Sequence, residues 1–352
     1  MKNVLVDFSD YDDFCGFGEI ARSYCPRLAM ADAPDLHFIF ILPEKHCGEF
    51  GTHIDYIPKE RIRQALRQYP ETIDLWHATH QQFRYRRHRK GTLQLLTVHD
   101  LNYLHEKHGI HLLRHKLEMP WLIRRSDAVS VISEYVKHDI ENHIPFLNKD
   151  LMVIYNGISN VEAINQVQPS FVGDTNEKFF LCIGQVREKK NIHVLVPMMK
   201  FFPNHKLYIC GTNHHKKYTN QIRSLISSED EKRILLTGTV TDEEKCWLYA
   251  HADALLFPSR LEGFGIPVLE AMRFGTKVFS SRYSCLPEVC ATHASYWDCY
   301  EPDAMAEVVK AGLTGWSRNG KAAEEARQYS LSFNYDNYTQ RYISLYRKLL
   351  NL

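Results

Sequence analysis

Residues 257–270 of the chain read FPSRLEGFGIPVLE, and this stretch decides the fold class of the half that contains it. Residues 254–257, ALLF, are wholly apolar, as in a strand that is buried on both faces. Two glycines then allow a turn, and Pro267 suits the first turn of a helix, where its missing N–H costs no hydrogen bond. The stretch therefore predicts a buried strand, a glycine turn and a helix start. The backbone N–H groups at such a helix start favour an anion.

Two carboxylates flank this turn, Glu262 inside it and Glu270 in the first turns of the helix, with seven residues between them. A carboxylate accepts hydrogen bonds in pairs, which suits vicinal hydroxyl groups. An anion site framed by two hydroxyl-binding groups matches a nucleotide sugar, in which ribose, diphosphate and hexose follow one another. The alternative is an ordinary acidic loop in front of a helix.

The segment resembles the glutamate–seven–glutamate motif of the retaining glycosyltransferases of family 4, which have the GT-B fold. The resemblance implies that Glu262 contacts the donor sugar as a catalytic residue and that Glu270 binds the donor ribose. It further implies that a short run of backbone lies near the phosphate and sugar of the donor: Gly263, Phe264, Gly265 and Ile266.

The composition is that of an ordinary globular protein. At 352 residues the chain has room for two domains, each with its own core. A net charge of +1 argues against a dedicated nucleic-acid binder. The start of the chain enters a short strand without a signal-peptide pattern, and no apolar run approaches eighteen residues. Nine scattered cysteines without a Cys-x-x-Cys pair indicate reduced thiols. These features predict a cytoplasmic protein.

Apolar runs alternate with amphipathic stretches along both halves, which predicts two doubly wound parallel sheets. In the first half we expect strands over 4–8, 36–42, 73–76, 93–98, 128–132 and 151–154, and helices over 19–30, 59–68, 110–125 and 134–142. In the second half we expect strands over 179–183, 206–210, 234–236, 254–257 and 277–280, and helices over 192–202, 217–226, 242–250 and 267–274. The rest of the chain is expected to be helical, ending with a helix over 335–350.

The predicted fold class is α/β, with an N-terminal acceptor-side Rossmann-like domain over residues 1–160. A polar linker follows over 161–177, and a nucleotide-sugar-binding Rossmann-like domain occupies 178–334. The resemblance implies that the two domains face each other across a cleft, as in GT-B. It also implies that residues 335–352 pack back on the N-terminal domain, and Tyr338, Tyr342, Leu345 and Leu349 give that helix an apolar face.

Basic side chains follow the first strand of the second half, where residues 184–191 read GQVREKKN. The segment resembles the family pattern of Gly-Thr followed by Arg-Lys-Asn, with Lys189 and Lys190 in the Arg-Lys places and Gln185 in place of the family's early arginine. A charge-assisted bond to phosphate is about twice as strong as a neutral one. We expect Gly184 and Lys189 to bind the donor and Lys190 to act in catalysis. The alternative is a solvated charge cluster at a helix start.

His99 ends the predicted strand 93–98, at the carboxyl edge where α/β proteins place their sites. It resembles the family's cleft histidine, which faces the donor sugar from the first domain. An imidazole there can bond a sugar hydroxyl or help to stabilise positive charge on the sugar, directly or through a neighbouring carbonyl. The alternative is a structural histidine.

Residues 16–21, GFGEIA, fit the dinucleotide fingerprint G-x-G-x-x-A, which supports the rival hypothesis of an NAD(P)-dependent oxidoreductase. The spacing argues against it, because residues 9–15 intervene between the strand and the glycines. The acidic loop resembles the family's first loop, so we expect Gly16 and Gly18 to approach the donor phosphate and Asp12 and Asp13 to lie on the acceptor side. The alternative for the acids is a solvent-facing loop.

Charge reverses along the first half, from −6 over residues 1–58 to +8 over residues 59–125. The run 84–90, RYRRHRK, contains Arg86 and Arg87, which we assign to the acceptor side. Histidines 105, 108, 111 and 115 recur at helical spacing, and their basic neighbours favour a basic helix face over a metal site. Two hypotheses remain for these segments beside plain solvation: an anionic membrane surface or an acceptor phosphate.

The predicted activity is transfer of a hexosyl unit, with retention, from a GDP- or UDP-linked donor to a glycan or lipid-linked acceptor. The resemblance points to bacterial surface polysaccharide or lipopolysaccharide assembly. We expect no metal, no other cofactor and no nucleic-acid partner. The location we expect is cytoplasmic, with peripheral binding to the inner face of the cytoplasmic membrane. A catalytically silent binding subunit remains a third hypothesis.

Overall fold

The computed structural model describes the chain except for residues 14–15, 70–71, 82–90, 146, 148 and 175. The chain forms two compact units. The first contains residues 1–159 and 333–352, and the second contains residues 160–332.

A seven-stranded parallel sheet forms the centre of the first unit, in the strand order β3-β2-β1-β4-β5-β6-β7. Its strands are β1 (Lys2–Asp7), β2 (Leu36–Leu42), β3 (Asp55–Pro58), β4 (Leu75–Ala78), β5 (Leu93–Val98), β6 (Ala128–Val131) and β7 (Leu151–Val153). Because all neighbours are parallel, the carboxyl ends of these strands lie at one edge of the sheet.

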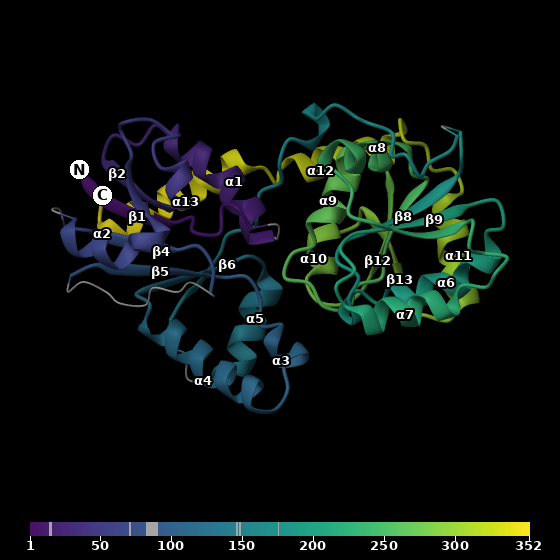
Figure 1. Cartoon of the computed structure of the whole chain (residues 1–352), viewed down its shortest axis with the longest axis horizontal. Coiled ribbons are helices and arrows are strands. Elements are labelled where there is room, and N and C mark those ends of the chain that lie inside the picture. The colour runs from purple at the N-terminus through teal and green to yellow at the C-terminus, as the bar shows by residue number, and fades with distance from the viewer. Residues whose placement is uncertain (14–15, 70–71, 82–90, 146, 148, 175) are drawn as a thin grey trace. The chain divides into compact units, whose positions relative to one another are not determined.

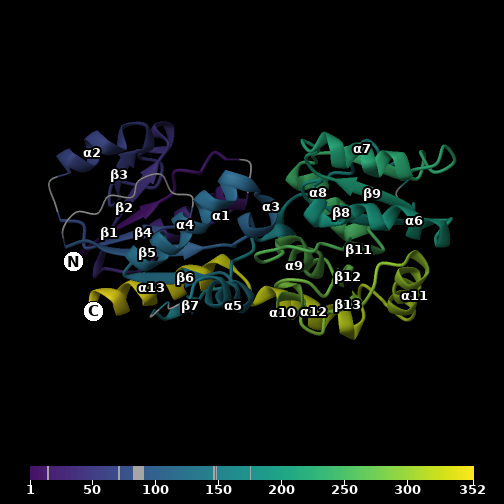
Figure 2. The ribbon, with the colours of Figure 1, turned by 90° about the horizontal axis from the view of Figure 1, so that it is seen from below.

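Helices cover both faces of this sheet. They are α1 (Gly16–Ala29), α2 (Ile62–Gln68), α3 (Tyr103–Glu106), α4 (Gly109–Arg125), α5 (Glu134–His143) and α13 (Tyr335–Leu350), with 3₁₀ turns η1 (Glu44–His46) and η2 (Lys59–Arg61). Successive strand residues point to opposite faces, so Val4 and Val6 pack with α1 and α13, whereas Leu5 packs with α2. Figure 2 shows α2 and α13 on opposite sides of the strands.

The helix α13 is tied to the first unit by a chain of buried hydrogen bonds, although it lies far along the sequence. Figure 1 shows it, in yellow, beside α1 and β1. The Tyr346 hydroxyl lies 2.8 Å from the Tyr24 hydroxyl and 2.6 Å from Nδ1 of His77, and Nε2 of His77 lies 2.8 Å from Oγ1 of Thr97. Burial, with a smaller effect of nearby His99, lowers the pKa of His77 to about 3. The histidine is therefore neutral, as a buried group without a carboxylate partner should be.

The second unit is built around a six-stranded parallel sheet in the order β10-β9-β8-β11-β12-β13. Its strands are β8 (Phe179–Ile183), β9 (Lys206–Cys210), β10 (Ile234–Gly238), β11 (Ala254–Phe257), β12 (Lys277–Ser281) and β13 (Ala294–Trp297). Its helices are α6 (Leu195–Met198), α7 (Lys216–Leu225), α8 (Asp242–His251), α9 (Ile266–Arg273), α10 (Leu286–Cys290), α11 (Pro302–Leu313) and α12 (Lys321–Leu331), with 3₁₀ turns η3 (Val161–Ala163), η4 (Glu188–Lys190), η5 (Ile192–Val194) and η6 (Met199–Phe201).

The segment predicted as a linker, residues 161–177, is held on the second unit. Arg273 is buried and its guanidinium lies 2.6 Å from the carboxylate of Glu162. The backbone N–H of Val167 donates to the carbonyl of Glu243. Ion pairing and backbone bonding of this kind fix a segment that has little apolar periodicity of its own.

In the described part of the chain the strand predictions are confirmed for eleven of thirteen strands, and β3 and β13 are the two that the sequence pattern did not predict. Both are four-residue strands at an edge of their sheet. Edge strands pair on one side only, so they tolerate polar residues and proline and lose the apolar signature. The prediction that residues 281–334 are entirely non-strand was therefore wrong. The helix predicted over 192–202 is a succession of η5, α6 and η6.

Candidate functional site

The turn between β11 and α9 has the conformation that its sequence predicts. Gly265 caps α9 with φ +94°, a left-handed conformation that favours glycine, and Pro267 occupies the first turn of the helix. A Cβ on Gly265 would lie 2.8 Å from Cδ2 of Leu286. Glycine is therefore required at this position for two reasons: the left-handed backbone angle and the close approach of Leu286 on α10.

Within the turn, Glu262 meets the basic segment that follows β8. Its Oε1 accepts a hydrogen bond from Nζ of Lys190 at 2.5 Å, and the two side chains are only 11% and 15% exposed. The ammonium also lies 5.2 Å from the centre of the Phe257 ring. Two predicted site residues that are 72 positions apart thus form one largely buried ion pair.

Gly184 and Lys189 are placed around this pair. A Cβ on Gly184 would lie 3.7 Å from Nζ of Lys190, so the glycine leaves room beside the ammonium. The carbonyl of Lys189 accepts hydrogen bonds from the backbone N–H of Arg260, at 2.8 Å, and from the Ser259 hydroxyl. These bonds join the two loops that carry the predicted donor-binding residues.

Glu270 lies on α9 and is almost completely buried, with 3% of its surface exposed. Its Oε1 accepts a bond from Nζ of Lys245 at 3.0 Å and its Oε2 accepts one from the Tyr249 hydroxyl at 2.9 Å. Both partners come from α8, which starts with a capping box at Thr241. Lys245 and Tyr249 were not predicted from the sequence. Their spacing of four on a predicted helix, which places both on one face, is the signal that could have identified them.

The other turn residues surround the Glu262 backbone. Phe264 is buried, whereas Gly263 and Ile266 are half-buried. The N–H of Glu262 donates to Oγ of Ser284, and the thiol of Cys285 donates to the Glu262 carbonyl. Burial raises the pKa of the Cys285 thiol well above its usual range, so it is an inert thiol that packs against the turn.

In the first unit His99 is buried where β5 ends. Its Nε2–H donates to the Thr79 carbonyl at 2.8 Å, and its backbone N–H donates to Oε1 of Gln81. Burial lowers the pKa of His99 to about 4, although the bond to Thr79 opposes the shift. The ring is therefore neutral at neutral pH, and Nδ1 carries the lone pair. His99 can accept a hydrogen bond from a ligand hydroxyl but supplies no positive charge.

A second histidine lies beside His99 and was not predicted. Nε2 of His80 lies 2.9 Å from a carboxylate oxygen of Asp10, and the ring of Phe17 stacks on His80 with centres 4.7 Å apart. The same Phe17 ring meets His99 edge-on at 4.9 Å. The acidic loop and the glycine-capped helix α1 are thus joined to the strand ends by long-range contacts, which a local sequence pattern does not reveal.

The two glycines of α1 have different surroundings. A Cβ on Gly18 would lie 1.9 Å from the carbonyl oxygen of Asp13, so Gly18 is required by packing, whereas a Cβ on Gly16 would meet nothing within 4 Å. Asp13 is exposed. Asp12 is paired with Lys45 and His46; burial alone would raise its pKa, but hydrogen bonds from these two side chains lower it.

Arg86 and Arg87 lie outside the described residues. Among the residues that are described, no cluster of three or more His, Cys, Asp and Glu side chains is arranged to hold a metal ion. In the same residues no helix has the length and apolar character needed to span a bilayer.

Two family models match the chain, one on each unit. Glycosyltransferase Family 4 matches residues 22–160 and Glycosyl transferases group 1 matches residues 164–329. The chain belongs to the family 4 glycosyltransferases. The predicted fold class, GT-B with two Rossmann-like parallel-sheet domains, is confirmed as well.

Individual relatives agree with this family. An O-antigen chain mannosyltransferase, RfbU of Salmonella typhimurium, is 27% identical over 58% of this chain and 56% of its own length, so the chain spans little more than half of that relative. Among solved structures, the sucrose-phosphate synthase of Thermosynechococcus elongatus has a TM-score of 0.74 at 16% identity, over 100% of both chains. The Anabaena protein HepE, solved with UDP and glucose, has a TM-score of 0.73 at 15% identity, over 99% of this chain and 100% of its own.

Proposed function

We propose that this protein is a retaining glycosyltransferase that moves a hexosyl unit from a nucleotide-sugar donor to a glycan or lipid-linked acceptor. The observation that carries the proposal is the ion pair of Glu262 and Lys190 beside the glycine turn that starts α9. It joins a hydroxyl-binding carboxylate to a diphosphate-binding cation within hydrogen-bond distance. The sugar and the leaving group of a nucleotide sugar are adjacent in the same way.

The diphosphate of the donor is bound mainly through charge. Lys189 and Lys190 bind the diphosphate, together with backbone N–H groups of the turn over Gly263, Phe264, Gly265 and Ile266. Glu270 accepts hydrogen bonds from the ribose hydroxyls, and Lys245 and Tyr249 hold its carboxylate in place. Gly16 of the first unit approaches the donor phosphate through its backbone, which the open space around it allows.

The transfer step breaks the bond between the anomeric carbon and the diphosphate oxygen, and the electron pair stays on that oxygen. The acceptor hydroxyl oxygen forms the new bond to the same face of the anomeric carbon, and its proton passes to the released phosphate. Lys190 stabilises the negative charge that develops on the diphosphate. Neutral His99 accepts a hydrogen bond from a sugar hydroxyl and orients the hexose. Asp12, Asp13, Arg86 and Arg87 lie on the acceptor side. No metal ion takes part in the proposed step.

Mannose is the hexose that we favour, because RfbU is named a mannosyltransferase of the O-antigen chain. The same name supports an acceptor from bacterial surface polysaccharide or lipopolysaccharide assembly. The proposed location is the cytoplasmic face of the membrane, where nucleotide sugars are available.

The first test is a thermal-shift screen with GDP-mannose, UDP-glucose, NAD⁺ and NADP⁺. A ligand at 100 times its Kd stabilises the native state by about 2.7 kcal/mol, which raises Tm by several degrees. We expect one of the two sugar nucleotides to do so. A shift with NAD⁺ or NADP⁺ alone would favour the oxidoreductase and overturn the proposal.

The second test is turnover of the donor that binds. Release of the nucleoside diphosphate is measured with and without a lipid-linked or glycan acceptor, and NMR of the product compares its anomeric configuration with that of the donor. Retention supports the mechanism, whereas inversion contradicts it. Donor binding without hydrolysis or transfer would indicate the silent binding subunit instead.

A further inference from the structure

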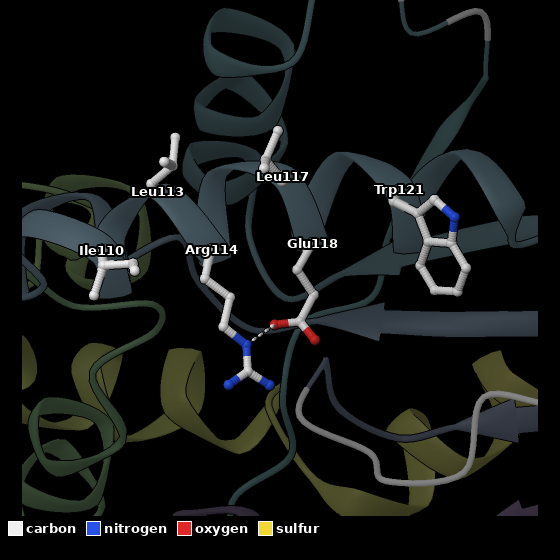
Figure 3. Close-up of a pocket in the computed structure, with 6 residues that line it drawn as sticks. All are labelled: Ile110, Leu113, Arg114, Leu117, Glu118 and Trp121. Atoms are coloured by element: carbon white, nitrogen blue, oxygen red, sulfur yellow. Dashed lines mark ion pairs between the residues drawn. The ribbon is translucent and has the colours of Figure 1, made fainter.

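The helix α4 has two apolar faces, and the first unit buries only one of them. Met119, Leu122 and Ile123 point inward and are buried. On the opposite side four large apolar side chains follow one another at helical spacing and line an open groove of about 670 Å³, which Figure 3 shows. We call these four residues the outer face of α4: Ile110, Leu113, Leu117 and Trp121.

The outer face of α4 gathers an unusual share of exposed apolar surface. Ile110 is 78% exposed, Leu117 68% and Trp121 43%. Of the ten large apolar side chains that are exposed in the described part of the chain, four belong to this face. Scattered exposed apolar residues need no explanation, but a continuous stripe of them marks an interaction surface.

Basic side chains border the stripe. Arg114, Lys116, Arg124 and Arg125 are all exposed on α4, and the guanidinium of Arg125 lies 4.9 Å from the Trp121 ring centre. Glu118 is the one acid in the α4 sequence; its side chain is 14% exposed, and its carboxylate lies 4.0 Å from Nε of Arg114. The outer face therefore combines an apolar stripe, a tryptophan and a clear excess of positive charge.

We propose that the outer face of α4 docks on an anionic lipid bilayer. The helix lies parallel to the membrane, with the apolar stripe at the boundary between headgroups and acyl chains and the basic side chains on lipid phosphates. The stripe runs over twelve residues, from Ile110 to Trp121, or about 17 Å of helix, which suits a helix lying in the interface. A second copy of this chain fits less well, because pairing two such faces brings like charges together. The inference does not depend on the transfer reaction, so vesicle binding tests it even if no donor is turned over.

Vesicle flotation tests this docking without donor or acceptor. We expect the protein to float with phosphatidylcholine vesicles that contain a quarter phosphatidylglycerol and not with phosphatidylcholine alone. The variant L113Q/L117Q should bind the anionic vesicles at least tenfold more weakly. The variant K116Q/R125Q should bind about 25-fold more weakly, since each basic residue near the surface contributes about fivefold. The controls on α7, L225Q and K216Q/K217Q, change residues that are also exposed and should bind as the wild type does.

Tryptophan emission gives an independent measurement. Trp121 is exposed, whereas Trp76, Trp247 and Trp297 are buried. Anionic vesicles should shift the emission to shorter wavelength and protect it from iodide quenching, and W121F should lose both effects. The proposal is overturned if the wild type ignores anionic vesicles up to millimolar lipid. It is also overturned if L113Q/L117Q binds anionic vesicles as well as the wild type does. A third contrary result is a wild type that binds no vesicles but self-associates, with self-association lost in L113Q/L117Q.

Discussion

The candidate sites of the two units hold their central side chains by different electrostatic contacts. In the second unit charged groups meet charged groups, as Lys190 meets Glu262 and Lys245 meets Glu270. In the first unit the strand ends carry the neutral imidazole of His99, held by a carbonyl, and a nearby helix exposes an apolar stripe. We propose that this difference divides the binding functions: the second unit binds the charged diphosphate, and the first binds hydroxyl groups and lipid.

The largest effect should follow from loss of the carboxylate in the second unit. We expect Glu262→Gln to lower kcat of transfer by about 10²–10³-fold, in the range found when one group that stabilises a transition state is removed. The fold should survive, because glutamine keeps the size of the side chain. Steady-state kinetics and circular dichroism measure the two quantities. The exposed Glu229→Gln is the matched control, and an E262Q enzyme with wild-type kcat would refute the assigned role.

The second prediction separates binding from stability at the buried carboxylate. Lys245→Met leaves Glu270 buried without its cation and should lower the free energy of unfolding by roughly 3 kcal/mol in urea titrations. Glu270→Leu removes the buried charge itself. In this variant Lys245 still has an ion pair with Asp242, at 3.1 Å, so the free energy of unfolding should stay near that of the wild type. We nevertheless expect Glu270→Leu to raise the donor KM at least tenfold. Equal losses of stability in both variants would contradict the ionic interpretation.

The third prediction tests the neutral histidine of the first unit. His99 titrates at about pKa 4 when folded and near 6.5 when unfolded, so below pH 6.5 the unfolded chain binds a proton that the folded chain does not. Its contribution is present above pH 6.5 and is lost as the pH falls towards 4. Between pH 7 and 5 the unfolding free energy should therefore fall by about 2 kcal/mol more in the wild type than in His99→Gln. The control His138→Gln changes an exposed histidine and should keep the wild-type pH dependence.

The smallest effect separates the glycines of the two units. Gly265→Ala should cost about 1–2 kcal/mol of unfolding free energy, because alanine is strained at φ +94° and its methyl group meets Leu286. Gly16→Ala should leave stability within about 0.5 kcal/mol, since the new methyl group meets no protein atom. If Gly16 approaches the donor phosphate, the same change raises the donor KM. Thermal unfolding and donor titrations measure both, and a large stability loss in Gly16→Ala would contradict the open surroundings.

The contrast between the units also explains what the sequence could predict. The second unit's site is mostly local: Glu262, Gly265 and Glu270 lie within nine residues, and their spacing specifies a strand, a turn and a helix. The fold was predictable for the same reason, because parallel strands buried on both faces are continuous apolar runs. The edge strands β3 and β13 lack such runs and were missed.

The first unit's site depends on contacts between distant segments. Asp10 meets His80 across seventy residues, and neither residue lies in a recognisable motif. The exposure of the outer face of α4 was not predicted, for a different reason. Its apolar spacing was predicted as part of an ordinary amphipathic helix, and only the three-dimensional structure shows that this helix buries the opposite side. Periodicity identifies an apolar face but does not say whether the protein itself covers it.

The hydrogen-bonded chain from Tyr24 through Tyr346 to His77 has a consequence for biosynthesis. Residues 160–332 are contiguous, so the second unit has all of its sequence before α13 is translated. The first unit does not, because part of its core comes from residues 333–352. We therefore expect the first unit to remain incompletely folded on the ribosome until the second unit has folded, although the first unit is synthesised earlier. During this time its tyrosine-rich interior is exposed to chaperones.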